Sequence, residues 1–252
     1  MFFSRKKSVK KQDKTEIKPA KTYNEKIPTH LGIIMDGNGR WATLKGKPRA
    51  FGHSEGSKVV DKIVRYAFSR GVKVITLYTF SSENWSRPKE EIDKLFSLLY
   101  QYLESKEKEF LESGIRFFVS GEILGLPEKL SKKIESVVSS TKNQKNGTLN
   151  LAFNYGGRQE IITAVNKAIS LGEEITADSV SRHLYTSEFP DPELIIRTSG
   201  EQRLSNFLLW QSAYSEFYFT KTLWPDFDEV EFDKAIADFN NRKRRFGGIN
   251  EK

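Results

Sequence analysis

Six short apolar runs alternate with longer helical patterns along this chain, and this alternation limits the folds that the chain can adopt. Strand-like runs occupy residues 31–35, 72–79, 115–120, 148–154, 192–197 and 214–219. Helical patterns fill the remainder, at residues 54–70, 88–113, 127–142, 157–171, 176–185 and 228–244. Strands separated by helices usually pair in parallel, so we expect one α/β domain over residues 25–252, with a mostly parallel six-stranded sheet flanked by helices.

The basic charge of the chain is concentrated in its first residues. Residues 1–21 hold eight Lys or Arg and two Asp or Glu, which gives +6 of the total of +8 and leaves +2 for the rest. So polar a segment cannot bury enough apolar surface to fold, which predicts a disordered basic tail over residues 1–24. The tail is either passive or weakly attracted to anionic lipid. The nearly balanced remainder argues against nucleic-acid binding.

Composition also indicates a compartment. The chain has no cysteine, which excludes disulfides and thiolate metal sites and favours a reducing environment. No apolar run approaches the roughly 18 residues that span a bilayer, and the N-terminus lacks the apolar segment of a secretory signal. We therefore expect a cytoplasmic protein that contacts a membrane at most peripherally.

The first strand-like run ends in residues suited to hold phosphate and metal. Asp36 follows the run directly, and these candidates come after it: Gly37, Asn38, Gly39, Arg40, Trp41, Arg49 and His53. In an α/β sheet this segment lies at the carboxyl edge, where ligands usually bind. Glycines let backbone N–H groups approach an anion closely, and a carboxylate can hold a hard cation beside it. The segment therefore predicts a phosphate-and-metal site.

A second polar segment follows the next strand-like run. It carries Ser81, Ser82, Glu83, Asn84, Trp85 and Arg87. Asn84 can hydrogen-bond a water or a phosphate, Arg87 can grip two diphosphate oxygens, and Trp85 offers a rigid apolar face. If the two strands are neighbours, this segment lies beside the first site. The alternative is an ordinary loop in which Pro88 starts the next helix.

Two more candidate groups come late in the chain. A strand runs into a loop that contains Arg197, Arg203, Leu204 and Ser205. The two arginines can converge on one polyanion, and solvated surface arginines are the alternative. Glu216 lies in an aromatic run, where a carboxylate is costly unless it is paired or bound to a metal. An ion pair with an arginine is the alternative for Glu216.

The number of arginines indicates the size of the ligand. The strand-ending loops supply Arg40, Arg49, Arg87, Arg197 and Arg203. A single phosphate does not need so many guanidinium groups, whereas two diphosphates with a divalent cation would use them. The chain lacks both the phosphate loop of P-loop nucleotidases and the glycine spacing of dinucleotide folds.

The long helical pattern at residues 88–113 has two interpretations. Its apolar side chains recur at helical spacing, at Leu95, Leu98, Leu99, Tyr102, Leu103 and Phe110. They form either a core face or, in part, the wall of an elongated apolar cavity. Periodicity does not distinguish the two.

These segments resemble the cis-prenyltransferases, from about residue 28 to Gly248. The matching motifs are His-Leu-Gly-Ile-Ile-Met-Asp-Gly-Asn-Gly-Arg-Trp-Ala, Arg-Ala-Phe-Gly-His, Phe-Ser-Ser-Glu-Asn-Trp-Ser-Arg-Pro, Asn-Tyr-Gly-Gly-Arg, Ile-Arg-Thr-Ser-Gly-Glu, Ser-Asn-Phe-Leu-Leu-Trp-Gln, Trp-Pro-Asp-Phe and Arg-Arg-Phe-Gly-Gly. So many separate matches in order make the resemblance specific. Only the basic tail lies outside it.

The resemblance implies a function. Members of this family condense isopentenyl diphosphate repeatedly onto an allylic diphosphate such as farnesyl diphosphate, with Mg²⁺, and form cis double bonds. The implied product is a long-chain polyprenyl diphosphate such as undecaprenyl diphosphate, the lipid carrier precursor for cell-wall polysaccharide. An apolar tunnel beside the sheet and a homodimer are also implied, with Arg245 and Gly247 near the active site of the partner.

The resemblance also implies roles for the candidate residues. Asp36 would be the metal-linked catalytic carboxylate, and Glu216 would complete the Mg²⁺ site. The backbone at residues 37–40, with Arg49 and His53, would bind the allylic diphosphate, while Trp41 orders the loop. The loop with Arg197, Arg203, Leu204 and Ser205 would hold isopentenyl diphosphate. Asn84 would assist proton removal, surrounded by Ser81, Ser82, Glu83, Trp85 and Arg87. Because an amide is a poor base, a water or the departing diphosphate is the better proton acceptor.

Two other functions are compatible with parts of the pattern. A non-catalytic scaffold subunit of a prenyltransferase complex would keep the fold, but the presence of Asp36, Asn84, Arg197, Arg203 and Glu216 argues against it. A nucleic-acid-binding module would depend on the basic tail alone.

Overall fold

The computed structural model describes residues 25–242. The predicted tail, and Arg245 and Gly247, lie outside the described residues. The strands are β1 (His30–Ile34), β2 (Val74–Ser81), β3 (Ile115–Ser120), β4 (Gly147–Tyr155), β5 (Leu194–Arg197) and β6 (Glu216–Phe219). The α-helices are α1 (Asn38–Leu44), α2 (Arg49–Ser69), α3 (Lys89–Ser113), α4 (Glu128–Thr141), α5 (Gly157–Ser170), α6 (Ala177–His183) and α7 (Glu229–Asn241). Residues 25–242 also contain two 3₁₀ turns, η1 (Ser82–Ser86) and η2 (Trp224–Asp226).

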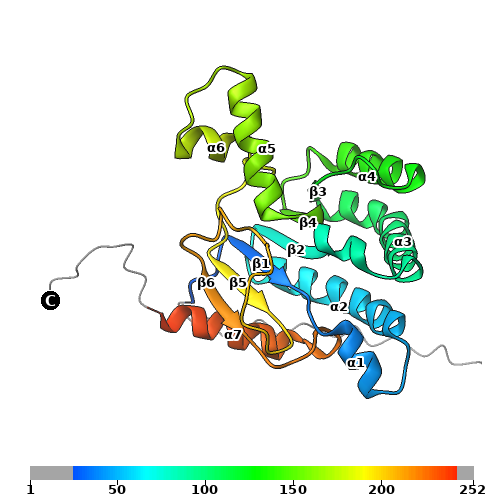
Figure 1. The fold of residues 1–252 in the computed structure, drawn as a ribbon. Coiled ribbons are helices and arrows are strands. Elements are labelled where there is room, and N and C mark those ends of the chain that lie inside the picture. The colour runs from blue at the N-terminus through cyan, green and yellow to red at the C-terminus, as the bar shows by residue number, and fades with distance from the viewer. Residues whose placement is uncertain (1–24, 243–252) are drawn as a thin grey trace, which may run out of the picture.

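All six strands are parallel and form one sheet in the order β3-β4-β2-β1-β5-β6 (Figure 1). This confirms the predicted α/β fold and its six strands. The strand order reverses beside β1, because β2 continues the sheet to one side and β5 to the other. Such a reversal leaves a crevice at the carboxyl ends of the central strands, where ligands bind in open α/β sheets.

Helix α1 is the one described α-helix that the sequence analysis did not predict. It follows β1 after a short turn and buries Trp41 and Ala42. With only two turns, it is too short for periodicity to reveal. Its glycine, Gly39, also lowers the helical propensity of the segment.

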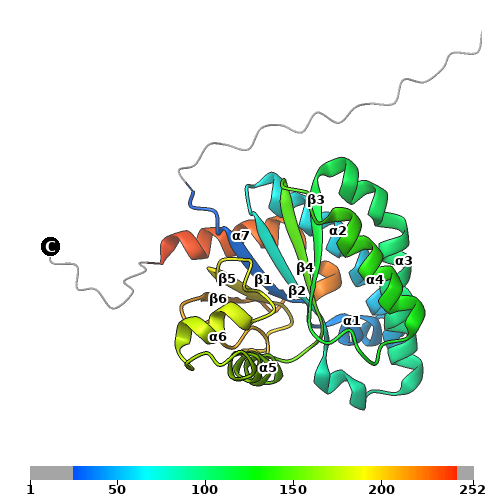
Figure 2. The same cartoon turned by 90° about the horizontal axis from the view of Figure 1, so that it is seen from above.

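Helices α2, α3, α4 and α7 pack against one face of the sheet, and α5 and α6 lie on the other side (Figure 2). Successive side chains of a strand point to opposite faces of the sheet, so each strand contributes to a core on both faces. In β1, Leu31 and Ile33 point into the larger core and Ile34 points into the smaller one. No helix within residues 25–242 is long and apolar enough to cross a membrane.

A row of buried polar side chains crosses the sheet on the face that carries the smaller core. His30 Nε2 lies 2.7 Å from the Thr76 hydroxyl, which also accepts a 3.1 Å hydrogen bond from Asn150 Nδ2. The Ser120 hydroxyl donates to Asn150 Oδ1 at 3.1 Å. Burial lowers the pKa of His30 to about 4, so His30 is neutral near pH 7. Each polar group in this row therefore has a partner.

Candidate active site

The centre of the site is an ion pair between Asp36 and Arg197. Asp36 follows β1 and Arg197 ends β5, and these strands are neighbours, so the two side chains meet at the carboxyl edge. Asp36 Oδ2 accepts a 2.9 Å hydrogen bond from Arg197 Nη2, and Oδ1 accepts the Gly37 N–H at 2.7 Å. Burial raises the pKa of Asp36, but hydrogen bonds from Arg197 and Ser199 outweigh burial and hold the pKa below its ordinary value. Asp36 is therefore an anion at neutral pH.

Two hydrogen bonds and a tight turn fix the backbone around Asp36. Thr198 Oγ1 donates to the Asp36 carbonyl oxygen at 2.6 Å, and the Trp224 N–H donates to the same oxygen at 3.1 Å. Gly37 turns the chain into α1 with a φ of 105°, and a Cβ there would lie 2.8 Å from the Leu223 side chain. Only glycine satisfies both the left-handed conformation and this close packing.

Arg197 also organises the loop after β5. Its Nη1 donates to the Ser205 hydroxyl at 2.7 Å and to the Arg203 carbonyl oxygen. Arg197 is only 3% exposed, whereas the Arg203 side chain is largely exposed and pairs with Glu201 at 2.5 Å. The structure thus brings the two predicted arginines into one loop, with Arg197 fixed and Arg203 at the surface.

The loops around this ion pair contain several left-handed residues other than glycine. They are Ser199 (φ 79°), Ser205 (φ 50°), Asn206 (φ 67°) and Leu208 (φ 43°). Such conformations cost about 1 kcal/mol or more each and tend to cluster at functional sites. Asn206 helps to hold them: its Nδ2 donates to Glu83 at 2.8 Å, and its Oδ1 accepts the Arg158 N–H at 2.9 Å. This joins the loop after β5 to η1 and α5.

Arg40 stands at the same centre, from the first turn of α1. Its Nη2 donates to the Ser199 hydroxyl at 2.5 Å and lies 3.7 Å from Asp36 Oδ2 and 3.4 Å from Glu201 Oε1. Arg40 is half exposed, so it can still turn toward an incoming anion. Ser199 therefore connects Arg40 with Asp36.

Beside Asp36 lies a polar pocket of about 170 Å³, lined by Met35, Asp36, Gly37, Asn38, Gly39, Arg40, Arg49, His53 and Arg87. Arg49 and His53 come from the first turns of α2, and Arg87 directly follows η1. The structure thus confirms that the first and second predicted segments lie together. Glu91, in the first turn of α3, contacts three of the basic side chains: Arg87 at 3.0 Å, His53 at 3.6 Å and Arg49 at 3.7 Å.

His53 is neutral in this pocket. Burial, together with the nearby positive charges of Arg87 and Arg49, lowers its pKa to about 4, although Glu91 opposes the shift. His53 Nε2 is buried and has no hydrogen-bond partner within residues 25–242. A buried polar atom without a partner is unusual and can be satisfied by a ligand.

The η1 segment holds Asn84 by a capping box. Asn84 Oδ1 accepts the Ser81 N–H at 3.1 Å, so the amide presents only its NH₂ donors to the cavity. Trp85 packs edge-on against Phe80 and donates to Asn154 Oδ1 at 2.8 Å. The Ser82 hydroxyl donates to the neighbouring Glu83 carboxylate at 3.2 Å.

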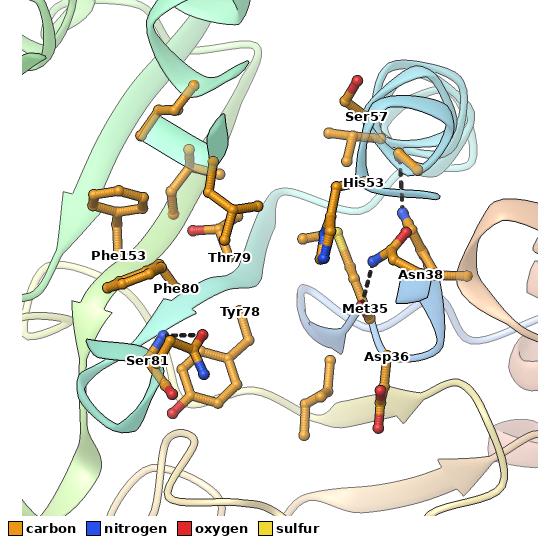
Figure 3. A pocket seen from close by; sticks show the side chains of 18 of the residues that line it. Met35, Asp36, Asn38, His53, Ser57, Tyr78, Thr79, Phe80, Ser81 and Phe153 are labelled. Atoms are coloured by element: carbon orange, nitrogen blue, oxygen red, sulfur yellow. Dashed lines mark hydrogen bonds between the residues drawn. The ribbon is translucent and has the colours of Figure 1, made fainter. Parts of the chain in front are cut away.

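A larger cavity of about 660 Å³ opens behind Asp36 and Asn84. Apolar side chains of α3 line it, namely Leu95, Leu98, Leu99 and Tyr102. Figure 3 shows Asp36, Asn38 and His53 on one side of this space and Phe80, Ser81 and Phe153 on the other. Both interpretations of the α3 face therefore apply, because Leu103 and Phe110 belong to the core while the α3 residues that line the cavity face it.

Two glycines of α2 allow α1 to approach the cavity. A Cβ on Gly52 would lie 1.9 Å from the Asn38 carbonyl oxygen, and one on Gly56 would lie 2.0 Å from Asn38 Oδ1. Any larger residue would push α1 away from α2. Asn38 Nδ2 donates to the Met35 carbonyl oxygen at 3.1 Å, and Oδ1 is buried without a partner in the described chain.

Five predicted substrate-binding residues line neither cavity, namely Trp41, Ser82, Trp85, Arg203 and Leu204. Trp41 is buried, donates to Asp226 at 2.7 Å and stacks on Phe51, so it fixes the position of α1. Leu204 packs against the smaller core. Trp41 and Leu204 support the site through packing.

The structure does not bring Glu216 to Asp36 within one chain. Glu216 begins β6 and pairs with Leu194, which pairs with Leu31, five residues before Asp36. The offset is about 15 Å along the strands and about 10 Å across them. Glu216 instead forms a 2.9 Å ion pair with Arg242, which was the alternative for this residue. Residues 25–242 contain no cluster of three or more acidic, histidine or cysteine side chains around a common metal position.

Sequence reasoning missed Glu91, Ser199 and Asn206 as parts of the site. An acidic residue in the first turn of a helix, such as Glu91 in α3, is common and does not by itself indicate a binding site. The spacing of four residues between Arg87 and Glu91 was the available signal for an ion pair. Ser199 and Asn206 act through loop conformation, which periodicity does not report.

The chain matches the family model described as putative undecaprenyl diphosphate synthase over residues 34–247. The chain belongs to the undecaprenyl diphosphate synthase family. It is therefore a prenyl-transferring enzyme, and the resemblance to cis-prenyltransferases is confirmed.

Members of the family from several bacteria are similar over most of the chain. An isoprenyl transferase of Fusobacterium nucleatum is 55% identical over 88% of this chain and 97% of its own, and one of Aquifex pyrophilus is 50% identical over 89% and 97%. Lavandulyl diphosphate synthase from Lavandula x intermedia, solved in complex with dimethylallyl diphosphate, superimposes with a TM-score of 0.84 at 36% identity, over 88% of this chain and 98% of that one. A probable undecaprenyl diphosphate synthase from Campylobacter jejuni gives 0.75 at 35% identity, over 87% and 98%.

Proposed function

We propose that this family member condenses isopentenyl diphosphate sequentially onto an allylic diphosphate, with farnesyl diphosphate as the expected primer. The product is a long cis-polyprenyl diphosphate such as undecaprenyl diphosphate, the carrier precursor for cell-wall polysaccharide. One observation carries this proposal: at Asp36 a polar pocket with basic walls opens beside a cavity of about 660 Å³ with apolar walls. That arrangement suits a substrate with an anionic head and a growing hydrocarbon chain.

The allylic diphosphate occupies the polar pocket in this proposal. Arg40, Arg49 and Arg87 can each donate to its oxygens, and the first-turn N–H groups of α1 have no partner within the helix. In the described part of the chain His53 Nε2 has no hydrogen-bond partner, so it can accept from or donate to the same head group. As the allylic C–O bond lengthens, these donors stabilise the charge that collects on the departing diphosphate.

The loop after β5 binds isopentenyl diphosphate. Arg197 and Ser205 both line the cavity and share a hydrogen bond, and the exposed Arg203 can turn from Glu201 toward a second phosphate. The isopentenyl carbon that forms the new bond is thereby directed toward the allylic carbon. Asn84 orients a water or a diphosphate oxygen that takes the proton, since its own carbonyl oxygen is engaged by Ser81.

Mg²⁺ fits this donor set. Asp36 lines both cavities and supplies a carboxylate, and Mg²⁺ commonly binds one or two protein carboxylates together with substrate phosphates and waters. When bound, the ion adds positive charge that favours departure of the diphosphate.

A homodimer is part of the proposal. Strand β6 is a sheet edge, and Tyr214 before it is 72% exposed. Helix α5 presents Ile162 and Ile169, which are 53% and 60% exposed. Exposed apolar side chains of this kind are typical of a protein interface. A role for Glu216 at the same ion as Asp36 requires a second protomer, given the distance between them in one chain.

The proposed location is the cytoplasm, with peripheral contact to the membrane through the lipid product and the basic tail. The connection between α1 and α2 supports such contact, because Leu44 is 80% exposed and is followed by the exposed Lys45 and Lys47. Lysines near an anionic surface contribute about 1 kcal/mol each.

The proposal is tested by chromatography of reaction products. Purified protein with Mg²⁺, farnesyl diphosphate and labelled isopentenyl diphosphate is expected to form polyprenyl diphosphates. Chelation of Mg²⁺ is expected to stop their formation. Absence of any product longer than the primer, at saturating substrates, would contradict the proposal.

A further inference from the structure

Glu91 occupies an unusual position for a carboxylate beside an anion site. It lies within 4 Å of three basic side chains that line the polar pocket, and its own side chain is only 14% exposed. Its contacts divide between both carboxylate oxygens: Oε1 meets Arg87 and His53, and Oε2 meets Arg49. In geometry and charge, this carboxylate resembles an anionic ligand that binds several basic groups at once.

The dipole of α3 does not explain this arrangement. Glu90 stands in the same first turn and satisfies the same dipole, yet it is exposed and forms no ion pair within residues 25–242. Of the two, only Glu91 is turned toward α2, where it contacts basic side chains that line the pocket. Helix α3 therefore brings a negative charge to a place where the proposed substrate brings another.

We infer that Glu91 is an internal counter-ion that competes with the diphosphate for Arg49 and Arg87. This inference rests on the proposed function, since it names how the allylic pocket exchanges its anions. In the empty pocket, Glu91 neutralises the guanidinium groups. When a diphosphate enters, its oxygens replace the carboxylate on Arg49 and Arg87, and Glu91 is left as a nearby like charge.

The exchange matters most at the end of each condensation. The allylic C–O bond breaks and its electron pair leaves with the diphosphate, a carbon–carbon bond forms to isopentenyl diphosphate, and one proton is lost. Inorganic pyrophosphate then remains in the pocket and has to leave before the elongated chain can place its own diphosphate there. Glu91 favours this departure by re-pairing with the arginines, so it acts as a positioning residue for product release.

The test uses the full chain and inorganic pyrophosphate as the probe, with Mg²⁺ present. Glu91→Gln keeps the size and one acceptor of the side chain but removes its charge. A unit charge a few ångströms from the bound anion, partly screened, predicts about tenfold tighter pyrophosphate binding by calorimetry. In steady state the same variant is expected to lower both KM for the allylic diphosphate and kcat, because release becomes slower.

Glu90→Gln is the matched control, since it removes the same charge from the same helical turn. It is expected to leave pyrophosphate affinity within about twofold of the parent protein. Glu91→Asp keeps the charge but withdraws it from Arg49 and His53, so its affinity is expected to fall between the parent and Glu91→Gln. If Glu91→Gln fails to fold, the pyrophosphate affinity of Glu91→Asp tests the inference in its place.

Weaker or unchanged binding in Glu91→Gln, or in Glu91→Asp where only that variant folds, would overturn the inference. Such a result would mean that Glu91 orients the arginines for the ligand instead of competing with it. Failure of the proposed function looks different, because the parent protein itself would then bind no pyrophosphate in the presence of Mg²⁺.

Discussion

The polar pocket and the apolar cavity share a wall, yet they are built on different principles. In the pocket, polar side chains are oriented by specific ion pairs and hydrogen bonds, such as those of Arg87 with Glu91 and of Arg40 with Ser199. In the cavity, leucines of α3 define only a volume. The pocket is therefore expected to respond to the loss of single atoms, and the cavity to changes in size.

The largest expected effect is that of Asp36→Ala, on the shared wall. It removes the anion that pairs with Arg197 and that would hold the metal, and we expect turnover to fall by about 10³-fold. Circular dichroism should show the fold intact, since α1 and β5 remain packed. Near-normal product formation in this variant would refute the assignment of the first loop.

A pH titration of stability should show the cost of keeping His53 neutral. Burial lowers its pKa from 6.5 to about 4 in the folded state, so the unfolded chain binds more protons between these values. His53 therefore leaves the free energy of unfolding undiminished above pH 6.5. As pH falls toward 4, this free energy decreases by about 3 kcal/mol. Chemical denaturation of His53→Gln should show a shallower loss over this window, and His30 should supply the remainder. An unchanged slope would contradict the buried neutral state of His53.

Ser199→Ala tests how far the pocket depends on orientation. The variant removes the hydroxyl that lies between Arg40 and Asp36 but leaves both charges in place. We expect kcat/KM for the allylic diphosphate to fall about tenfold, equivalent to one hydrogen bond to a charged group. Thr198→Val is not a suitable control, because Thr198 holds the Asp36 backbone. Ser86→Ala, in the exposed part of η1, should leave this parameter unchanged.

The smallest effect on rate is expected in the cavity, from Leu98→Phe. The added volume should shorten the product while the rate of the first condensation stays within about threefold, because no pocket contact is altered. Product chromatography and initial rates measure the two outcomes separately. A large drop in the initial rate with no change in product length would break the contrast between the two compartments.

The sequence predicted the parts of the site that depend on strand ends. Asp36 and Arg197 follow neighbouring parallel strands, so their proximity is a consequence of the sheet alone. The contacts of Glu91 could not be predicted in the same way, because they depend on how α3 is rotated over α2. The carboxylate of Glu216 in an aromatic strand correctly indicated a paired or bound group. Only the strand register, however, places Glu216 at the opposite end of β6 from Arg197.

The shared wall has a consequence for inhibitor design. Four residues border both compartments: Asp36, Asn38, His53 and Arg87. A compact multivalent anion and an apolar substituent can therefore be joined by a very short linker. Such a compound loses little freedom on linking its halves, and its potency should exceed that of either fragment by orders of magnitude. Added salt should weaken binding of the anionic fragment and leave binding of the apolar fragment unchanged.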